Sequence, residues 1–181
     1  MSLLSVEDTV LMVIDMQGNL YESVQDKPFL LENVRKLVQG MRIFGVPIIV
    51  TEQIPGKLGP TIGPVASLLT DDPRIPKADF SCCGDEKIMK ALKALKRRQV
   101  LLCGIEAHVC IYQTAIDLLG FGYEVHLVAD AVSSRTVLNR EIGIGKMRDE
   151  GAHLTSTEMV LFELIRTADD PKFKEIFKIV R

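Results

Sequence analysis

Short, almost wholly apolar runs alternate along this sequence with longer segments whose apolar residues recur at helical spacing. A strand that reads as a continuous apolar run is buried on both faces, which is typical of a parallel sheet covered by helices. We therefore predict an α/β fold, a doubly wound, Rossmann-like three-layer sandwich with a mainly parallel sheet. The predicted strands are Thr9–Asp15, Val46–Thr51, Val100–Cys103, Tyr123–Val128 and His153–Thr155, and the predicted helices are Phe29–Phe44, Glu86–Arg97, His108–Leu119, Val137–Glu150, Glu158–Ile165 and one after Pro171.

Length and composition predict one globular domain that works on a small partner. A chain of 181 residues is close to the common size of a domain, so we expect a single domain over residues 1–181. The net charge of −2 supplies no field to hold nucleic acid, which favours a small-molecule substrate. Apolar runs such as Val10–Ile14 are far shorter than the ~20 residues of a membrane span, and the N-terminus lacks the pattern of a signal peptide. We expect a cytoplasmic protein without a membrane partner.

The chain has four cysteines, with neither the spacing of a zinc site nor the density of a disulfide scaffold. We expect free thiols. Cys103 falls inside a predicted strand and fits a buried packing role. The adjacent pair Cys82 and Cys83 lies among small residues, where reactivity and packing are both open and packing is favoured.

Three residues with useful chemistry lie near predicted strand ends, where parallel sheets bind their ligands. Asp15 ends the first strand, where its carboxylate is a candidate for catalysis. The alternative is that it caps a helix or turn in the following loop. Cys110 falls in the first turn of a predicted helix, where unpaired N–H groups favour a thiolate; the alternative is a small buried side chain. Lys77 follows Pro76 in a short extended segment, and a solvated lysine is its alternative. Together they offer a nucleophile, a proton acceptor and a positive charge for acyl transfer.

Three segments read VIDMQ (residues 13–17), IPKADFS (75–81) and GIEAHVC (104–110), and the strand GYEVHLVADAVSS follows them. In this order they resemble the isochorismatase-like hydrolases, a cysteine hydrolase superfamily that also holds nicotinamidases and carbamoylsarcosine amidases. The resemblance extends over about Val10 to Phe162. It implies a six-stranded parallel sheet flanked by helices, and a catalytic triad of Asp15, Lys77 and Cys110.

The resemblance also implies a cis peptide bond before Glu106 and an oxyanion hole made by the backbone N–H groups of Glu106 and Cys110. The implied activity is cysteine-dependent hydrolysis of a small carboxamide or related acyl compound, in which a C–N bond is cleaved through a thioester. The alternative is a catalytically silent family member that acts as an oligomeric binding or scaffold protein. A homo-oligomer, dimer or tetramer, is also implied, and the segments 54–65 and 132–138 mix apolar residues with few charges.

Two differences from other members of this superfamily narrow the subgroup to which we expect the chain to belong. Nicotinamidases resemble one another in an Asp and His residues after the second strand that bind a metal, whereas this chain reads Thr51-Glu52-Gln53-Ile54 and has no histidine before His108. We therefore expect the metal-independent subgroup, without metal or other cofactor. True isochorismatases cleave a vinyl ether and can lack the cysteine, so Cys110 favours amide chemistry. The residues expected to line the pocket, each with a core or surface position as the alternative, are Tyr21, Gln53, Ile111 and Gln113.

Overall fold

The computed structural model describes residues 3–181, and its strands form a six-stranded sheet in which every neighbouring pair is parallel. The strand order is β3-β2-β1-β4-β5-β6. Among the described residues, no helix is long and apolar enough to cross a membrane. The strands are β1 (Thr9–Ile14), β2 (Ile48–Gln53), β3 (Arg74–Lys77), β4 (Gln99–Ile105), β5 (Glu124–Ser133) and β6 (His153–Thr155).

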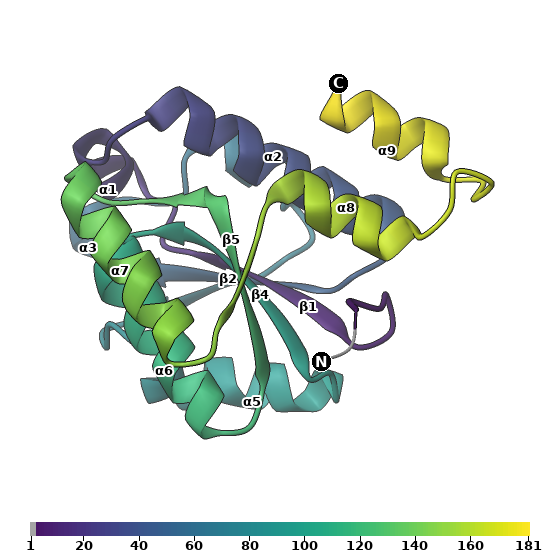
Figure 1. Ribbon diagram of the computed structural model, residues 1–181. Helices are drawn as coiled ribbons and strands as arrows, with labels where there is room; N and C mark the ends of the chain where they lie inside the picture. The colour runs from purple at the N-terminus through teal and green to yellow at the C-terminus, as the bar shows by residue number, and fades with distance from the viewer. Residues whose placement is uncertain (1–2) are drawn as a thin grey trace.

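Helices cover both faces of the sheet, which confirms the predicted three-layer sandwich (Figure 1). One face carries α2 (Lys27–Phe44), α8 (Thr157–Ile165) and α9 (Phe173–Val180). The other carries α5 (Glu86–Leu95), α6 (Tyr112–Gly120) and α7 (Val137–Asp149). Shorter elements connect these layers, namely α1 (Gly18–Ser23), α3 (Pro55–Leu58), α4 (Gly63–Ala66), η1 (Cys82–Gly84) and η2 (Ala107–Ile111).

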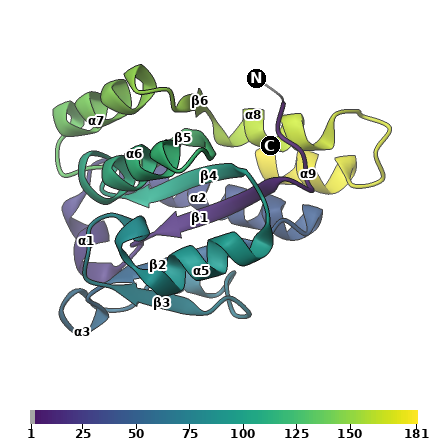
Figure 2. The ribbon, with the colours of Figure 1, turned by 90° about the horizontal axis from the view of Figure 1, so that it is seen from below.

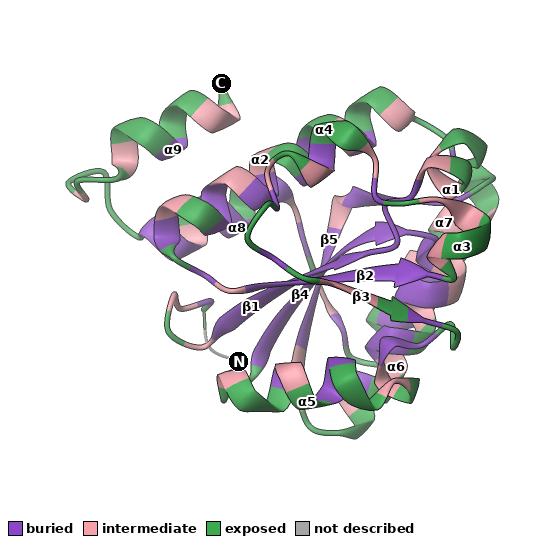
Figure 3. Ribbon diagram, turned by 180° about the vertical axis from the view of Figure 1, so that it is seen from behind, coloured by how far each residue is buried: buried purple, intermediate pink, exposed green. Residues whose placement is uncertain are grey.

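The apolar strands build two separate cores, one on each face of the sheet. Successive side chains of β1 point to opposite faces, so Leu11 and Val13 join the core under α2 and α8. Val10 and Met12 join the core under α5 and α6. Every residue of β1 is buried, and the central strands are coloured as buried in Figure 3. This two-sided burial is the reason why the strands read as unbroken apolar runs.

The strand order makes the sheet doubly wound, with its switch point between β1 and β4. The chain first builds outward from β1 to β2 and β3, then returns to the other side of β1 and builds β4, β5 and β6. In Figure 2 the arrows of β1 and β4 point toward the end of the sheet at which α1 lies. Because ligands of such sheets bind outside the carboxyl ends of the strands at the switch point, this end is the place to search for a site.

The structure differs from the predicted elements where local periodicity is weak. The strand predicted to end at Val128 continues to Ser133, after a register shift against β4 between Leu102 and Gly104. The helix predicted from His108 begins instead as η2, a single π-helical turn that runs into α6. The four-residue helices α3 and α4 were not predicted, because one turn is too short to show a hydrophobic period.

Candidate active site

Asp15 directly follows β1 and has a φ of 53°, a left-handed conformation that is uncommon outside glycine. Its side chain is fully buried. Thr51 on the neighbouring strand donates its hydroxyl to Asp15 Oδ1 at 2.8 Å. Lys77 Nζ lies 2.7 Å from Asp15 Oδ2. Both carboxylate oxygens therefore have a donor, and one donor is the cation that a buried carboxylate needs.

Lys77 ends β3, two strands away from β1, and its side chain is also fully buried. Besides Asp15, its ammonium contacts Gln53 Oε1 at 2.6 Å. The carbonyl oxygens of Phe80 and Asp79 accept from the same nitrogen at 3.1 and 3.2 Å. The ammonium is thus surrounded by oxygen acceptors, which compensate for the water that it loses on burial.

Two opposing effects set the pKa of Lys77. Burial disfavours the ammonium form and lowers the pKa, whereas the charge of the Asp15 carboxylate and its hydrogen bond raise it. The net result is a pKa above the ordinary value of 10.5. Lys77 is therefore a cation throughout the neutral pH range.

Cys110 lies in η2, directly after β4, and only 5% of the residue is exposed. Its thiol is close enough to the Asp15 carboxylate for the two groups to influence each other's protonation. Burial first, and the charge of Asp15 second, raise the pKa of Cys110 from 9.0 to about 12, although Lys77 acts in the opposite direction. The predicted effect of the helix start on the thiolate stays a prediction, and burial of the sulfur acts against it. Cys110 therefore rests as a thiol beside the Asp15 carboxylate.

Gly104 allows β1 and β4 to approach closely enough to bring these groups together. It has a φ of 118°, a conformation that favours glycine. A Cβ atom at this position would lie 2.0 Å from the carbonyl oxygen of Ile14, the residue before Asp15. A side chain is therefore excluded at the switch point, and the loop that carries Cys110 starts directly beside Asp15.

The loop after β4 holds the peptide groups expected to form the oxyanion hole. The Ile105–Glu106 peptide bond is cis, as the resemblance implied. The Glu106 carbonyl oxygen accepts from the N–H groups of Val109 at 3.0 Å and Ile111 at 3.2 Å, which flank the thiol-bearing residue. Arg135 fixes the Glu106 side chain, with its Nε 3.0 Å and its backbone N 3.2 Å from Glu106 Oε2. The assignment of the oxyanion hole to Glu106 and Cys110 stays a prediction.

Two further side chains lie against this cluster: Thr51, which the sequence reasoning missed, and Cys82, for which it favoured packing. Thr51 belongs to an apolar strand and gave no signal except its hydroxyl. Cys82 is fully buried, as the packing interpretation expected, and its sulfur lies 3.9 Å from Thr51 Oγ1. Burial raises the pKa of Cys82 to about 11, so it is a thiol at neutral pH. All four cysteines are free.

The four residues predicted to line the pocket are placed in different environments. Gln53 is buried and contacts Lys77. Tyr21 is half-buried in α1 and donates its hydroxyl to the Lys27 carbonyl oxygen at 3.0 Å. Ile111 is fully buried in the core under α5 and α6, and Gln113 is exposed on α6. A role in the pocket stays a prediction for all four.

Glu52, the second-last residue of β2, uses its carboxylate for structure. Glu52 Oε1 accepts from the backbone N–H of Thr61 at 2.8 Å and from its hydroxyl at 2.7 Å. These two bonds hold the chain between α3 and α4 against β2. Within residues 3–181, no group of three or more His, Cys, Asp or Glu side chains is placed to hold a metal ion.

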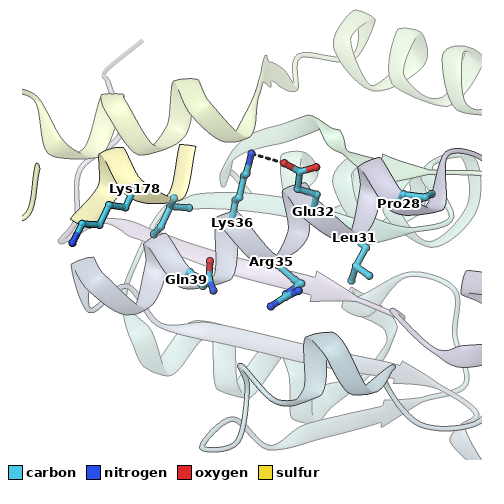
Figure 4. A pocket seen from close by; sticks show the side chains of 8 residues that line it. Pro28, Leu31, Glu32, Arg35, Lys36, Gln39 and Lys178 are labelled. Atoms are coloured by element: carbon cyan, nitrogen blue, oxygen red, sulfur yellow. Dashed lines mark ion pairs between the residues drawn. The ribbon is translucent and has the colours of Figure 1, made fainter. Parts of the chain in front are cut away.

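A surface pocket of about 470 Å³ lies elsewhere, between α2 and α9 (Figure 4). Arg35 of α2 and Lys178 of α9 line it, and Lys36 forms an ion pair with Glu32 at 2.6 Å along its wall. None of its lining residues belongs to the Asp15, Lys77 and Cys110 cluster. The pocket is thus separate from the switch point.

Fold and site together define a doubly wound α/β protein with a buried carboxylate, ammonium and thiol at its switch point. The family model described as the isochorismatase domain matches residues 9–159 of this chain. The chain belongs to the isochorismatase family and has its hydrolase fold.

Relatives and solved structures cover nearly the whole chain. Isochorismatase domain-containing protein 2 of Danio rerio is 41% identical over 178 residues, which are 98% of this chain and 89% of that protein. A structure described as MAR1 ribonuclease from Caenorhabditis elegans matches with a TM-score of 0.94 at 37% identity. The match covers 99% of this chain and 92% of the chain in that structure. YcaC from Pseudomonas aeruginosa, solved with hexane-2,5-diol and covalent acrylamide, has a TM-score of 0.93 at 25% identity, with 98% and 91% covered.

Proposed function

We propose that this protein is a cysteine-dependent hydrolase of a small carboxamide or related acyl compound and that it needs no metal. The observation that carries the proposal is the buried cluster in which Asp15 pairs with Lys77 Nζ at 2.7 Å and acts on the Cys110 thiol. A nucleophile, a base beside it and a group that orients the base are the parts that covalent acyl transfer requires.

In the first half-reaction, Asp15 takes the proton of Cys110 while the sulfur attacks the carbonyl carbon of the substrate. Proton transfer is coupled to attack because the free thiolate is disfavoured in this buried site. The carbonyl oxygen becomes an oxyanion held by the backbone N–H groups of Glu106 and Cys110. Asp15 then gives its proton to the departing nitrogen, the C–N bond breaks, and an amine or ammonia leaves a thioester on Cys110.

In the second half-reaction, a water molecule gives a proton to Asp15 and attacks the thioester carbonyl. The same backbone donors hold the second oxyanion. When the C–S bond breaks, the sulfur takes the proton back from Asp15, and the acid product leaves. Lys77 stays protonated in both half-reactions and holds the carboxylate in place between its two roles as base and acid.

Burial favours a small substrate over a polymer. Cys110 is 5% exposed and Lys77 is 3% exposed, so a reacting group has to reach the sulfur through a narrow opening. RNA is the contrasting substrate class, because the Caenorhabditis elegans neighbour is described as a ribonuclease. The covalent acrylamide in the Pseudomonas aeruginosa neighbour supports the small-molecule reading, since acrylamide is itself a small carboxamide.

We also propose that the chain self-associates, as a dimer or tetramer. Apolar side chains are exposed in both segments expected to mediate it: Ile54 is 39% exposed, Val137 51% and Leu138 64%. Such groups gain free energy when a second copy covers them. The silent scaffold protein shares this feature, so the two functions differ in the reactivity of Cys110 and not in assembly.

The test is a screen of small amides, with ammonia or acid release as the readout and mass spectrometry for an acyl adduct on Cys110. We expect turnover of at least one small carboxamide, an adduct that Cys110→Ser lacks, and no loss of rate with a chelator. Turnover of RNA without turnover of any amide would overturn the proposal. Absence of all turnover, together with alkylation of Cys110 no faster than that of Cys83, would establish the silent scaffold protein instead.

A further inference from the structure

Gln53 ends β2 beside Lys77, and both ends of its side-chain amide are occupied. Its Oε1 accepts from Lys77 Nζ at 2.6 Å, and its Nε2 donates to the Ala78 carbonyl oxygen at 2.6 Å. Chemistry fixes this orientation of the amide, because the reverse would set an NH₂ group against an ammonium and an oxygen against a carbonyl. Gln53 is 5% exposed, so its side-chain amide is held inside the protein by these two bonds.

A second buried glutamine holds the backbone of Gln53. Gln17 Oε1 accepts from the Gln53 N–H at 2.6 Å, and Gln17 Nε2 donates to the Gln53 carbonyl oxygen at 3.0 Å. The backbone of β1 leaves strand conformation at Asp15, so the side chain of Gln17 supplies the pair of bonds that the next strand residue would have made. The end of β2 therefore keeps its strand position next to Asp15.

Lys77 depends on this arrangement for its placement. Its ammonium belongs to β3, whereas Asp15 belongs to β1, and β2 lies between them. The long lysine side chain has several rotatable bonds, and only its acceptors fix where the charge stands. Gln53 is the one side-chain acceptor that β2 gives it, among the bonds described for residues 3–181.

We propose that Gln53 is a positioning residue that fixes the Lys77 ammonium against Asp15 and Cys110. This rests on the proposed function only in its consequence for turnover. The placement of the ammonium has an effect that needs no substrate, because the charge of Lys77 favours the thiolate form of Cys110.

The experiment measures the rate at which iodoacetamide alkylates Cys110 in the folded protein, by mass spectrometry of the Cys110 peptide. Gln53→Met keeps the length of the side chain and removes both polar ends, and we expect alkylation about tenfold slower than in the unaltered protein. Gln39→Met, a half-buried glutamine of α2 outside the cluster, is the matched control and is expected to leave the rate unchanged. Lys77→Met gives the rate without any ammonium.

Whether the alkylation rate falls or rises in Gln53→Met distinguishes a positioning role of Gln53 from a merely structural one. A Gln53→Met chain that is merely loosened exposes Cys110 to solvent, which lowers its pKa toward 9.0 and speeds alkylation, so an equal or faster rate overturns the inference. The pH dependence gives a second readout. Lys77 loses an acceptor in Gln53→Met, so its pKa falls and the rise of the alkylation rate with pH flattens earlier than in the unaltered protein.

Failure of this inference and failure of the proposed function are distinguishable. If Lys77→Met slows alkylation while Gln53→Met does not, the ammonium activates the thiol without Gln53, and the inference alone is overturned. If neither variant changes the alkylation rate, Lys77 does not act on Cys110. Both the inference and the proposed function are then overturned. If no amide is hydrolysed but Gln53→Met and Lys77→Met both slow alkylation, the positioning role stands and the amidase proposal does not.

Discussion

Cys110 combines a raised pKa with a position beside the Asp15 carboxylate. A free cysteine nucleophile is commonly activated by a lowered pKa, but burial and the Asp15 charge raise the pKa of this thiol to about 12. In the mechanism that we propose, the proton therefore leaves as the sulfur attacks, and the carboxylate that accepts it is held by Lys77 and Thr51.

Replacement of the sulfur separates chemistry from folding. Cys110→Ser changes one buried atom and is expected to lower hydrolysis by at least about 10³-fold, because a hydroxyl is a far weaker nucleophile without a stronger base. The fold is expected to persist, with a thermal midpoint within a few degrees of the unaltered protein. Hydrolysis rates and thermal unfolding monitored by circular dichroism check both parts. Retained turnover of an accepted substrate would contradict a covalent mechanism through this cysteine.

Between elements, the decisive contact is the approach of β4 to β1 at the switch point. Six residue pairs run in parallel register from Thr9↔Gln99 to Ile14↔Gly104, so the last pair places Gly104 beside the residue that precedes Asp15. From that point β4 leads into η2, and Cys110 reaches the carboxylate. The two halves of the cluster are thus joined by backbone packing rather than by a loop that could adjust.

Gly104→Ala tests this approach. The added Cβ meets the Ile14 carbonyl oxygen at 2.0 Å, and alanine rarely adopts a φ of 118°, so the backbone has to shift. We expect a loss of about 3 kcal/mol or more in the free energy of unfolding, together with loss of hydrolysis. Gly120→Ala at the end of α6 has open space around it and is expected to change stability by less than about 1 kcal/mol. Urea unfolding of both variants measures these free energies. An equal free energy of unfolding in Gly104→Ala and Gly120→Ala would show that β1 and β4 can move apart at no energetic cost.

Across the whole molecule, buried thiols make stability depend on alkaline pH. Burial raises the pKa of Cys82 to about 11 and raises that of Cys103 further, from an ordinary value of 9.0. In this window the unfolded chain releases protons that the folded chain retains, so rising pH stabilises the unfolded state. Lys77 acts in the same direction: its contribution is complete below the ordinary value of 10.5 and is lost as pH rises through its raised pKa.

The free energy of unfolding is therefore expected to be flat near neutral pH and to fall from about pH 9, by about 1 kcal/mol at pH 10 for each fully buried thiol. Urea unfolding under reducing conditions at several pH values measures this. Cys103→Ala is expected to lower stability at every pH but to reduce the alkaline slope. A free energy that does not fall between neutral pH and pH 10 would contradict the assignment of raised thiol pKa values.

Self-association is the second property of the whole molecule. Val137 and Leu138 begin α7 with more than half of each residue exposed. We expect sedimentation at micromolar concentration to give a species of at least twice 20.1 kDa, and Leu138→Asp to shift it toward the single chain, because the charge would be buried in the interface. Lys90→Asp on the exposed side of α5 is the control for added charge. A species of 20.1 kDa alone in the unaltered protein would contradict the proposal.

The layers of this protein, and the strand ends at which its candidate site lies, could be predicted from local sequence patterns. Apolar runs such as Val10–Ile14 are local signals of two-sided burial, and Asp15 can be identified as a carboxylate at the end of one of them. Which side chains meet depends on tertiary packing. The bond from Lys77 to Gln53, 24 residues apart, depends on the register of two strands, and the pKa of Cys110 depends on how much water the fold removes from it. Register and desolvation are properties of packed elements, and no window of sequence contains them.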